Sequence, residues 1–120
     1  MRRAVLLVWL LCWPLSGQSQ FLDGNALMTA CTGTGKGEPR DSVPRYNKCV
    51  RYLTGVSDAT EAWQDLGFIK PKRVCIPEDL DSEQLRQAFV AYMRQRTGQW
   101  RVTAGSLAVG AFLSVWPCNE

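Results

Sequence analysis

Four cysteines are the residues of this chain whose chemistry is easiest to predict. All of them follow an N-terminal stretch with the pattern of an export signal, and they are Cys31, Cys49, Cys75 and Cys118. Exported chains fold in oxidising compartments, where small domains depend on disulfides for stability. Four cysteines allow three pairings. We favour Cys31–Cys49, which would join the first two expected helices, and Cys75–Cys118, which would tie the end of the chain back. In the chain-entropy model these bridges contribute about 3 and about 4 kcal/mol.

The same cysteines are poor candidates for other chemistry. Structural zinc sites usually contain two cysteines separated by two residues, and redox-active thiols favour the same pattern, whereas every spacing here is long. The chain has no histidine, so a catalytic thiol or serine would lack its usual base. The glycine-rich segment 33–37 lacks the serine or threonine that follows the lysine of a phosphate-binding loop. We therefore expect no catalytic residue, no metal and no cofactor.

Carboxylates are the remaining groups that could act as general acids or bases. Asp58, Glu61 and Asp65 recur at a spacing of three and four residues, which is typical of the solvated face of a helix. The acidic residues between 78 and 81 surround an expected helix start, where the helix dipole stabilises negative charge. A small hydrolase acting through these carboxylates is therefore the least favoured function.

Residues 1–19 have the composition of a signal peptide. Two arginines precede an apolar run, and small residues suit cleavage after Ser19. A membrane anchor is disfavoured because the run is shorter than the roughly 20 apolar residues that a span needs. A lipid-modified Cys12 is disfavoured because no small residue precedes it. Residues 20–120 then form one small domain, which we place in the periplasm.

The charge of the mature chain argues against some partners. Removing the two signal arginines lowers the formal net charge from +3 to about +1. So small a charge does not favour binding to a phosphate backbone, and the basic run at 70–73 is typical of a solvated loop. We expect no nucleic-acid partner, and no membrane contact after signal cleavage.

Apolar periodicity predicts four helices and no strand. Asp23 should cap a short helix that ends before Gly33, and a long helix should cover about 45–66. Asp81 should open a third helix through a capping box with Gln84. A last helix should cover about 102–115. The predicted fold is all-α, a compact bundle of about four helices stapled by two disulfides.

The periodicity also predicts which side chains are buried. In the long helix, the apolar stripe that begins at Tyr46 continues beyond Gly55 through Trp63 and Leu66. In the last helix, the apolar stripe reaches Val115. Gly55 predicts either a kink or the close approach of another backbone.

The order of several short motifs resembles the Tai-type immunity family over about residues 22–118. The motifs are Gly24-Asn25-Ala26-Leu27 before Cys31, the segment 52–59 after Cys49, Cys75-Ile76-Pro77, Gln84-Leu85, Val90-Ala91-Tyr92-Met93, and the terminal Ala104, Leu107-Ala108, Ala111-Phe112 and Trp116-Pro117-Cys118. The resemblance implies an all-helical periplasmic protein without catalytic activity, often a homodimer. It implies that the partner is a cognate peptidoglycan amidase effector of type VI secretion, whose active-site cleft is blocked by a protruding loop.

Two polar loops are our candidates for contact with such a partner. The loop between the last two helices contributes Arg94, Arg96, Gln99, Trp100 and Arg101, and the loop between the first two contributes Lys36 and Arg40. Trp100 is either an exposed interface anchor flanked by arginines or a core residue. The alternative function is a periplasmic binding or structural module of the same fold that has no toxin partner.

Overall fold

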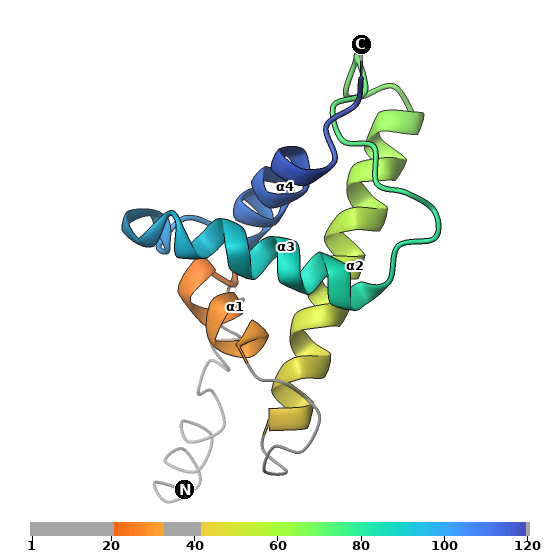
Figure 1. Ribbon diagram of the computed structural model, residues 1–120. Coiled ribbons are helices and arrows are strands. Elements are labelled where there is room, and N and C mark those ends of the chain that lie inside the picture. Colours follow the sequence, from red (N-terminus) through yellow and green to blue (C-terminus); the bar gives the residue numbers. More distant parts are fainter. Residues whose placement is uncertain (1–20, 33–41, 120) are drawn as a thin grey trace, which may run out of the picture.

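Four helices and one short 3-10 turn account for the regular structure of the chain (Figure 1). The computed structural model describes residues 21–32 and 42–119. The helices are α1 (Gly24–Cys31), α2 (Ser42–Asp65), α3 (Ser82–Arg94) and α4 (Ala104–Val115), with the turn η1 (Thr97–Gln99) between the last two. The prediction of an all-α fold of four helices is confirmed. Signal residues 1–19, Lys36 and Arg40 lie outside the described residues.

The helix starts follow the predicted capping chemistry. The Asp23 carboxylate accepts a hydrogen bond from the Ala26 backbone N–H at 2.8 Å. At α3, Asp81 Oδ1 accepts from the Gln84 N–H at 2.9 Å, and the Asp81 N–H donates to Gln84 Oε1 at 3.1 Å. These bonds satisfy N–H groups that have no partner within the helix.

All six pairs of helices contact one another. Figure 1 shows α2 as the longest element, crossed by α3, with α1 and α4 on opposite sides of α3. Each helix contributes at least one fully buried large side chain to the core: Leu27, Leu53, Phe89, Met93 and Phe112. The apolar stripes of α3 and α4 therefore face inward as predicted.

The predicted burial of the end of α2 is wrong. Trp63 is 56% exposed and Leu66 is 72% exposed, and Val115 at the end of α4 is 49% exposed. The physical reason is length: α2 has 24 residues, whereas α3 has 13 and α4 has 12. The last turns of α2 therefore extend past the helices that would cover them.

Gly55 also differs from its prediction. The helix continues through it, and a Cβ atom added there would meet no atom within 4 Å. Neither a kink nor a close backbone contact explains this glycine.

Both predicted disulfides, Cys31–Cys49 and Cys75–Cys118, are present. The first joins α1 to α2 inside the core, where both cysteines are fully buried. The second ties the segment before α3 to the segment after α4. Next to it, the Cys75 N–H donates to the Trp116 carbonyl at 2.9 Å and the Cys118 N–H donates to the Arg73 carbonyl at 3.0 Å.

Gln64 is the one buried polar side chain among the described residues. Its Oε1 accepts from the backbone N–H groups of Arg73 and Val74 at 2.8 and 2.9 Å, and its Nε2 donates to the Val74 carbonyl at 2.9 Å. Because both the oxygen and the nitrogen of the Gln64 amide are hydrogen-bonded, burying this side chain leaves neither atom without a partner. Gln64 thereby holds the segment after α2, and with it the chain end, against that helix.

Within the described residues, no helix combines the length and the apolarity that crossing a membrane requires.

Candidate partner-binding surface

Five of the seven predicted contact residues lie within residues 94–103, which we call the connection between α3 and α4. Arg94 is the last residue of α3, and the other four follow it. The connection leaves α3 through a hydrogen bond from the Arg96 N–H to the Met93 carbonyl at 3.0 Å and then forms η1. The Val102 N–H donates to the Gln99 carbonyl at 3.0 Å, which closes the turn that follows. These local bonds give the connection a defined shape.

The start of the described chain fixes this connection from the other side. The Gly24 N–H donates to the Val102 carbonyl and the Asn25 N–H donates to the Trp100 carbonyl, both at 2.9 Å. The Ala104 N–H donates to the Leu22 carbonyl at 2.8 Å. Three backbone hydrogen bonds to residues 22–25 therefore hold the α4 end of the connection, from Trp100 to Ala104, and the bond from Arg96 to Met93 holds the α3 end.

Trp100 is the inward-facing member of the connection. Its side chain is partly buried against the core, and its indole N–H donates to the Met93 carbonyl at 3.1 Å. A tryptophan with its N–H bonded to the adjacent helix end supports the fold. Whether it also touches a partner stays a prediction, but replacing it is expected to disturb the connection as well.

The polar contact candidates lie on the outer side of the same connection. Arg94, Arg96, Gln99 and Arg101 are all exposed. The Arg96 guanidinium lies over the Tyr92 ring, 4.3 Å from its centroid, and such a cation–π contact favours one orientation of the side chain. The surface presents three guanidinium groups, which donate in fixed planar geometry to carboxylates and carbonyls.

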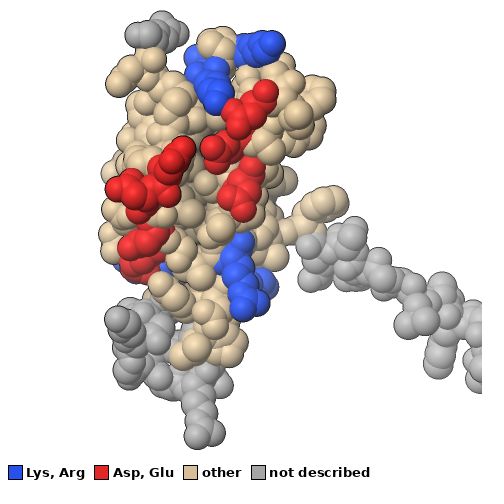
Figure 2. Space-filling model, turned by 90° about the vertical axis from the view of Figure 1, so that its right-hand side faces the viewer, with Lys and Arg blue, Asp and Glu red and all other residues tan. Residues whose placement is uncertain are grey.

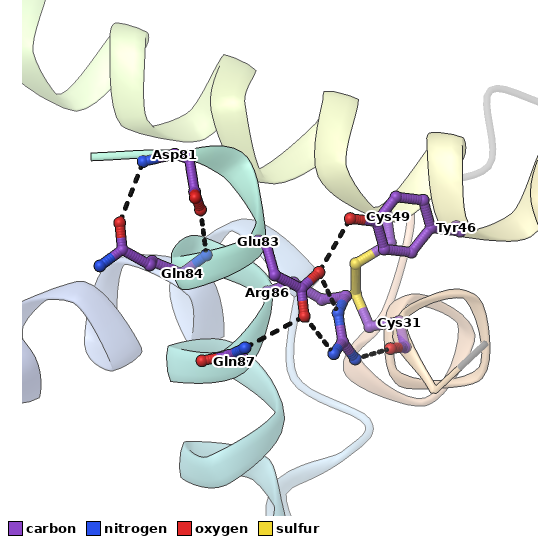
Figure 3. Close-up of polar contacts among 8 residues, drawn as sticks. All are labelled: Cys31, Tyr46, Cys49, Asp81, Glu83, Gln84, Arg86 and Gln87. Carbon is purple, nitrogen blue, oxygen red and sulfur yellow. Dashed lines mark hydrogen bonds and ion pairs between the residues drawn. A yellow bond between two sulfur atoms is a disulfide. The ribbon is translucent and has the colours of Figure 1, made fainter. Parts of the chain in front are cut away.

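A polar network that the sequence did not reveal joins α1, α2 and α3 (Figure 3). Glu83 accepts hydrogen bonds from the Tyr46 hydroxyl at 2.8 Å and from Arg86 at 2.9 and 2.6 Å. Arg86 also donates to the carbonyl of Cys31 at 2.8 Å, beside the buried disulfide. The spacing of Glu83 and Arg86 is the sequence signal for their ion pair. Nothing local in the sequence points to Tyr46.

This network fixes the charge of its carboxylate. The hydrogen bonds from Arg86 hold the pKa of Glu83 at about 2, well below its ordinary value of 4.5. The hydrogen bond to Glu83 in turn raises the pKa of the Tyr46 phenol above 10.0. Since every member is bonded to another, the arrangement is that of a structural clamp.

Acid should weaken the clamp. A carboxylate whose pKa is lowered on folding stabilises the fold fully above pH 4.5, and that stabilisation is lost as the pH falls toward about 2. The shift corresponds to roughly 3 kcal/mol at most. The Glu83 side chain is 36% exposed, so we expect solvent screening to leave about 1 kcal/mol.

Denaturant titrations across this pH range should show a shallower loss of stability for Glu83→Gln than for the parent. Glu78→Gln is the matched control and should lose stability as the parent does. If Glu83→Gln also loses as much stability as the parent when the pH falls, the assignment is wrong.

The predicted acidic face of α2 is exposed to solvent. Two neighbouring hollows of ≈ 190 and ≈ 260 Å³ share Ser57, Glu61, Ile76 and Glu78. Figure 2 shows the acidic side chains spread over the outer surface of this part of the molecule. Asp58, Glu61 and Glu78 are all exposed, which is the geometry of a solvated helix face. Within residues 21–32 and 42–119, no three metal-binding side chains come together.

A family model described as Rap1a immunity proteins matches residues 23–118, which is most of the chain. No curated protein and no solved structure matches.

Proposed function

Because the chain belongs to the Rap1a immunity protein family, a non-enzymatic family whose members inhibit amidase effectors of type VI secretion, we propose that it binds its cognate effector and plugs the active-site cleft. The predicted resemblance to Tai-type immunity proteins agrees with this membership. The membership also favours immunity over a binding module with no toxin partner. Such an effector cleaves peptide bonds of peptidoglycan, so the inhibitor would act in the periplasm, where its disulfides form.

The connection between α3 and α4 is the surface that we assign to the effector. The observation that carries this assignment is the fixed base of the turn, since three backbone hydrogen bonds join it to residues 22–25. A preordered segment loses less conformational entropy on binding than a flexible one. The projecting Arg94, Arg96 and Arg101 can donate to the carbonyl and carboxylate groups of a cleft built to hold a peptide.

Two arginine substitutions test the assignment. Arg96→Ala and Arg101→Ala are each expected to weaken effector binding at least about tenfold, since arginines at the centre of an interface are frequent hot spots. Isothermal titration calorimetry with the cognate amidase measures the affinity, and an activity assay on peptidoglycan measures the inhibition. Both residues are exposed, so both variants should fold. The thermal stability of Arg101→Ala should not change, and Arg96→Ala should lose about 0.5–1 kcal/mol with its cation–π contact to Tyr92.

Arg51→Ala is the matched control, because Arg51 is an exposed arginine on α2 rather than on the connection. Unchanged affinity in both test variants would move the contact to another surface. Trp100→Ala is a poor test of the interface alone. Its indole N–H bonds to the Met93 carbonyl and its ring packs against the core, so we expect that variant to lose stability too.

The homodimer implied by the family resemblance stays a prediction. The mass of the oxidised protein in solution, measured with and without the effector, gives the number of copies in each state.

A further inference from the structure

The end of α2 carries a cluster of exposed apolar side chains that the function proposed above does not use. Trp63 is 56% exposed, Leu66 is 72%, Phe68 is 70% and Ile69 is 39%. We call these four residues the apolar tip. Exposing so much apolar surface at one place is costly in water, and such patches usually mark a surface that contacts something.

Local geometry gathers the four side chains into one projection. The N–H groups of Phe68 and Ile69 both donate to the Trp63 carbonyl, at 3.0 and 3.3 Å, so the chain turns back on the helix end. Gly67 allows this turn because its φ angle is +80°. The Trp63 and Phe68 rings then pack together with their centroids 5.2 Å apart.

An apolar groove continues from the apolar tip along the molecule. It lies between α2 and α4, and its lining residues are Val56, Ala59, Thr60, Trp63, Ile69, Gly105 and Val109. The apolar surface is therefore contiguous and reaches beyond the turn itself.

Three cations follow directly on the apolar tip. Lys70, Lys72 and Arg73 are exposed. Lys72 forms a salt bridge with Asp65, whose side chain is also exposed. The stem of Lys70 lies over Gly67, so its methylene groups extend the apolar surface while its ammonium group stays in water. In Figure 2, one group of Lys and Arg side chains lies at the upper end of the face, the acidic side chains lie below it, and a second basic group lies lower still.

We propose that the apolar tip docks on an anionic phospholipid surface. Tryptophan, phenylalanine and leucine side chains favour the boundary between headgroups and acyl chains, and adjacent lysine and arginine side chains are attracted to anionic lipid. The proposed contact is peripheral. It departs from the prediction of no membrane contact, which rested on composition, and it is independent of the effector-binding proposal.

Charge favours a lipid over a second copy of this chain as the occupant. A two-fold contact through the apolar tip would bring two copies of the same patch together. Each copy would contribute three cations, Lys70, Lys72 and Arg73, and the Asp65 carboxylate that pairs with Lys72, so the contact would carry an excess of positive charge. An anionic membrane pairs with those cations instead. Glu61 and Glu78 line a hollow beside Lys72, so repulsion would keep that hollow turned from the lipid while Lys70 and Arg73 face it.

Vesicle flotation of the oxidised mature chain, residues 20–120, tests the proposal. The vesicles contain phosphatidylglycerol and phosphatidylcholine in equal parts, or phosphatidylcholine alone. We expect binding to the anionic vesicles, weaker binding to the neutral ones, and a decrease with added salt. The double variant Leu66→Gln/Phe68→Gln should bind at least about tenfold more weakly. The double variant Lys70→Gln/Arg73→Gln should lose about fivefold for each cation removed.

Matched variants away from the apolar tip serve as controls. Leu113→Gln removes an apolar side chain that is 43% exposed on α4, and Arg51→Gln removes an exposed cation on α2. Both should bind vesicles as the parent does, and circular dichroism should show that all variants fold. The proposal is overturned if the parent does not bind anionic vesicles or if the tip variants bind as well as the controls. It is also overturned if sedimentation shows a dimer that the tip variants dissociate, because that result would assign the apolar tip to self-association.

Discussion

Replacing both Cys75 and Cys118 with serine is expected to lower the free energy of unfolding by about 4 kcal/mol. The disulfide closes a loop with a sequence separation of 43 residues, so its loss releases much chain entropy to the unfolded state. The loss is serious because domains of this size typically have a net stability of only about 5–15 kcal/mol. Denaturant unfolding of the oxidised proteins, monitored by far-ultraviolet circular dichroism, gives the difference. The double substitution is preferred because it leaves no unpaired thiol.

The second bridge provides the comparison for this experiment. Cys31→Ser/Cys49→Ser opens a loop with a separation of 18 residues, for which the same model gives about 3 kcal/mol. Peptide mapping of the unreduced parent should recover both linked pairs. An unfolding midpoint of Cys75→Ser/Cys118→Ser equal to that of the parent would refute the stabilising role of the bridge.

Gly24→Ala is expected to lower the free energy of unfolding by up to about 3 kcal/mol, which is the usual cost of overpacking a tight core. A Cβ atom at Gly24 would lie 2.9 Å from the Trp100 carbonyl oxygen and would collide with the Leu107 side chain. Leucine can move, but the carbonyl belongs to the connection that carries the candidate contact residues. Thermal unfolding measures the loss, and effector affinity should fall with it because the connection must shift.

Gly55→Ala is the matched control for this prediction, since the substitution is the same and the environment is open. Alanine favours a helix over glycine by roughly 1 kcal/mol, so this variant should be more stable than the parent. Equal effects at the two positions would show that the close contact at Gly24 does not matter.

The helices of this fold are predictable because their signals are local. Asp81 and Gln84 mark the start of α3 by a reciprocal pair of hydrogen bonds, and the apolar period of the following residues places Phe89 and Met93 in the core. The predicted disulfide pairing is also confirmed: Cys31 and Cys49 belong to consecutive helices, and their pairing leaves Cys75 for Cys118.

The surface was less predictable because it depends on how elements meet. Periodicity places Trp63 on the apolar stripe of α2, but it does not say that the helices opposite are too short to cover it. Tyr46 and Glu83 are 37 residues apart, and only the crossing of α2 and α3 brings them together. For Trp100 the sequence left two roles open, and its bond to Met93 explains its part in the fold.

The anchored chain end has a practical consequence for measuring this protein. Cys118 is tied to Cys75, and Figure 1 shows the segment after α4 running toward the end of α2 and away from the connection between α3 and α4. If the protein is immobilised on a sensor chip through a C-terminal tag, the arginines of the connection between α3 and α4 stay accessible to an amidase in solution. The same orientation would turn the apolar tip toward the chip surface, so lipid-binding experiments require protein that is not immobilised.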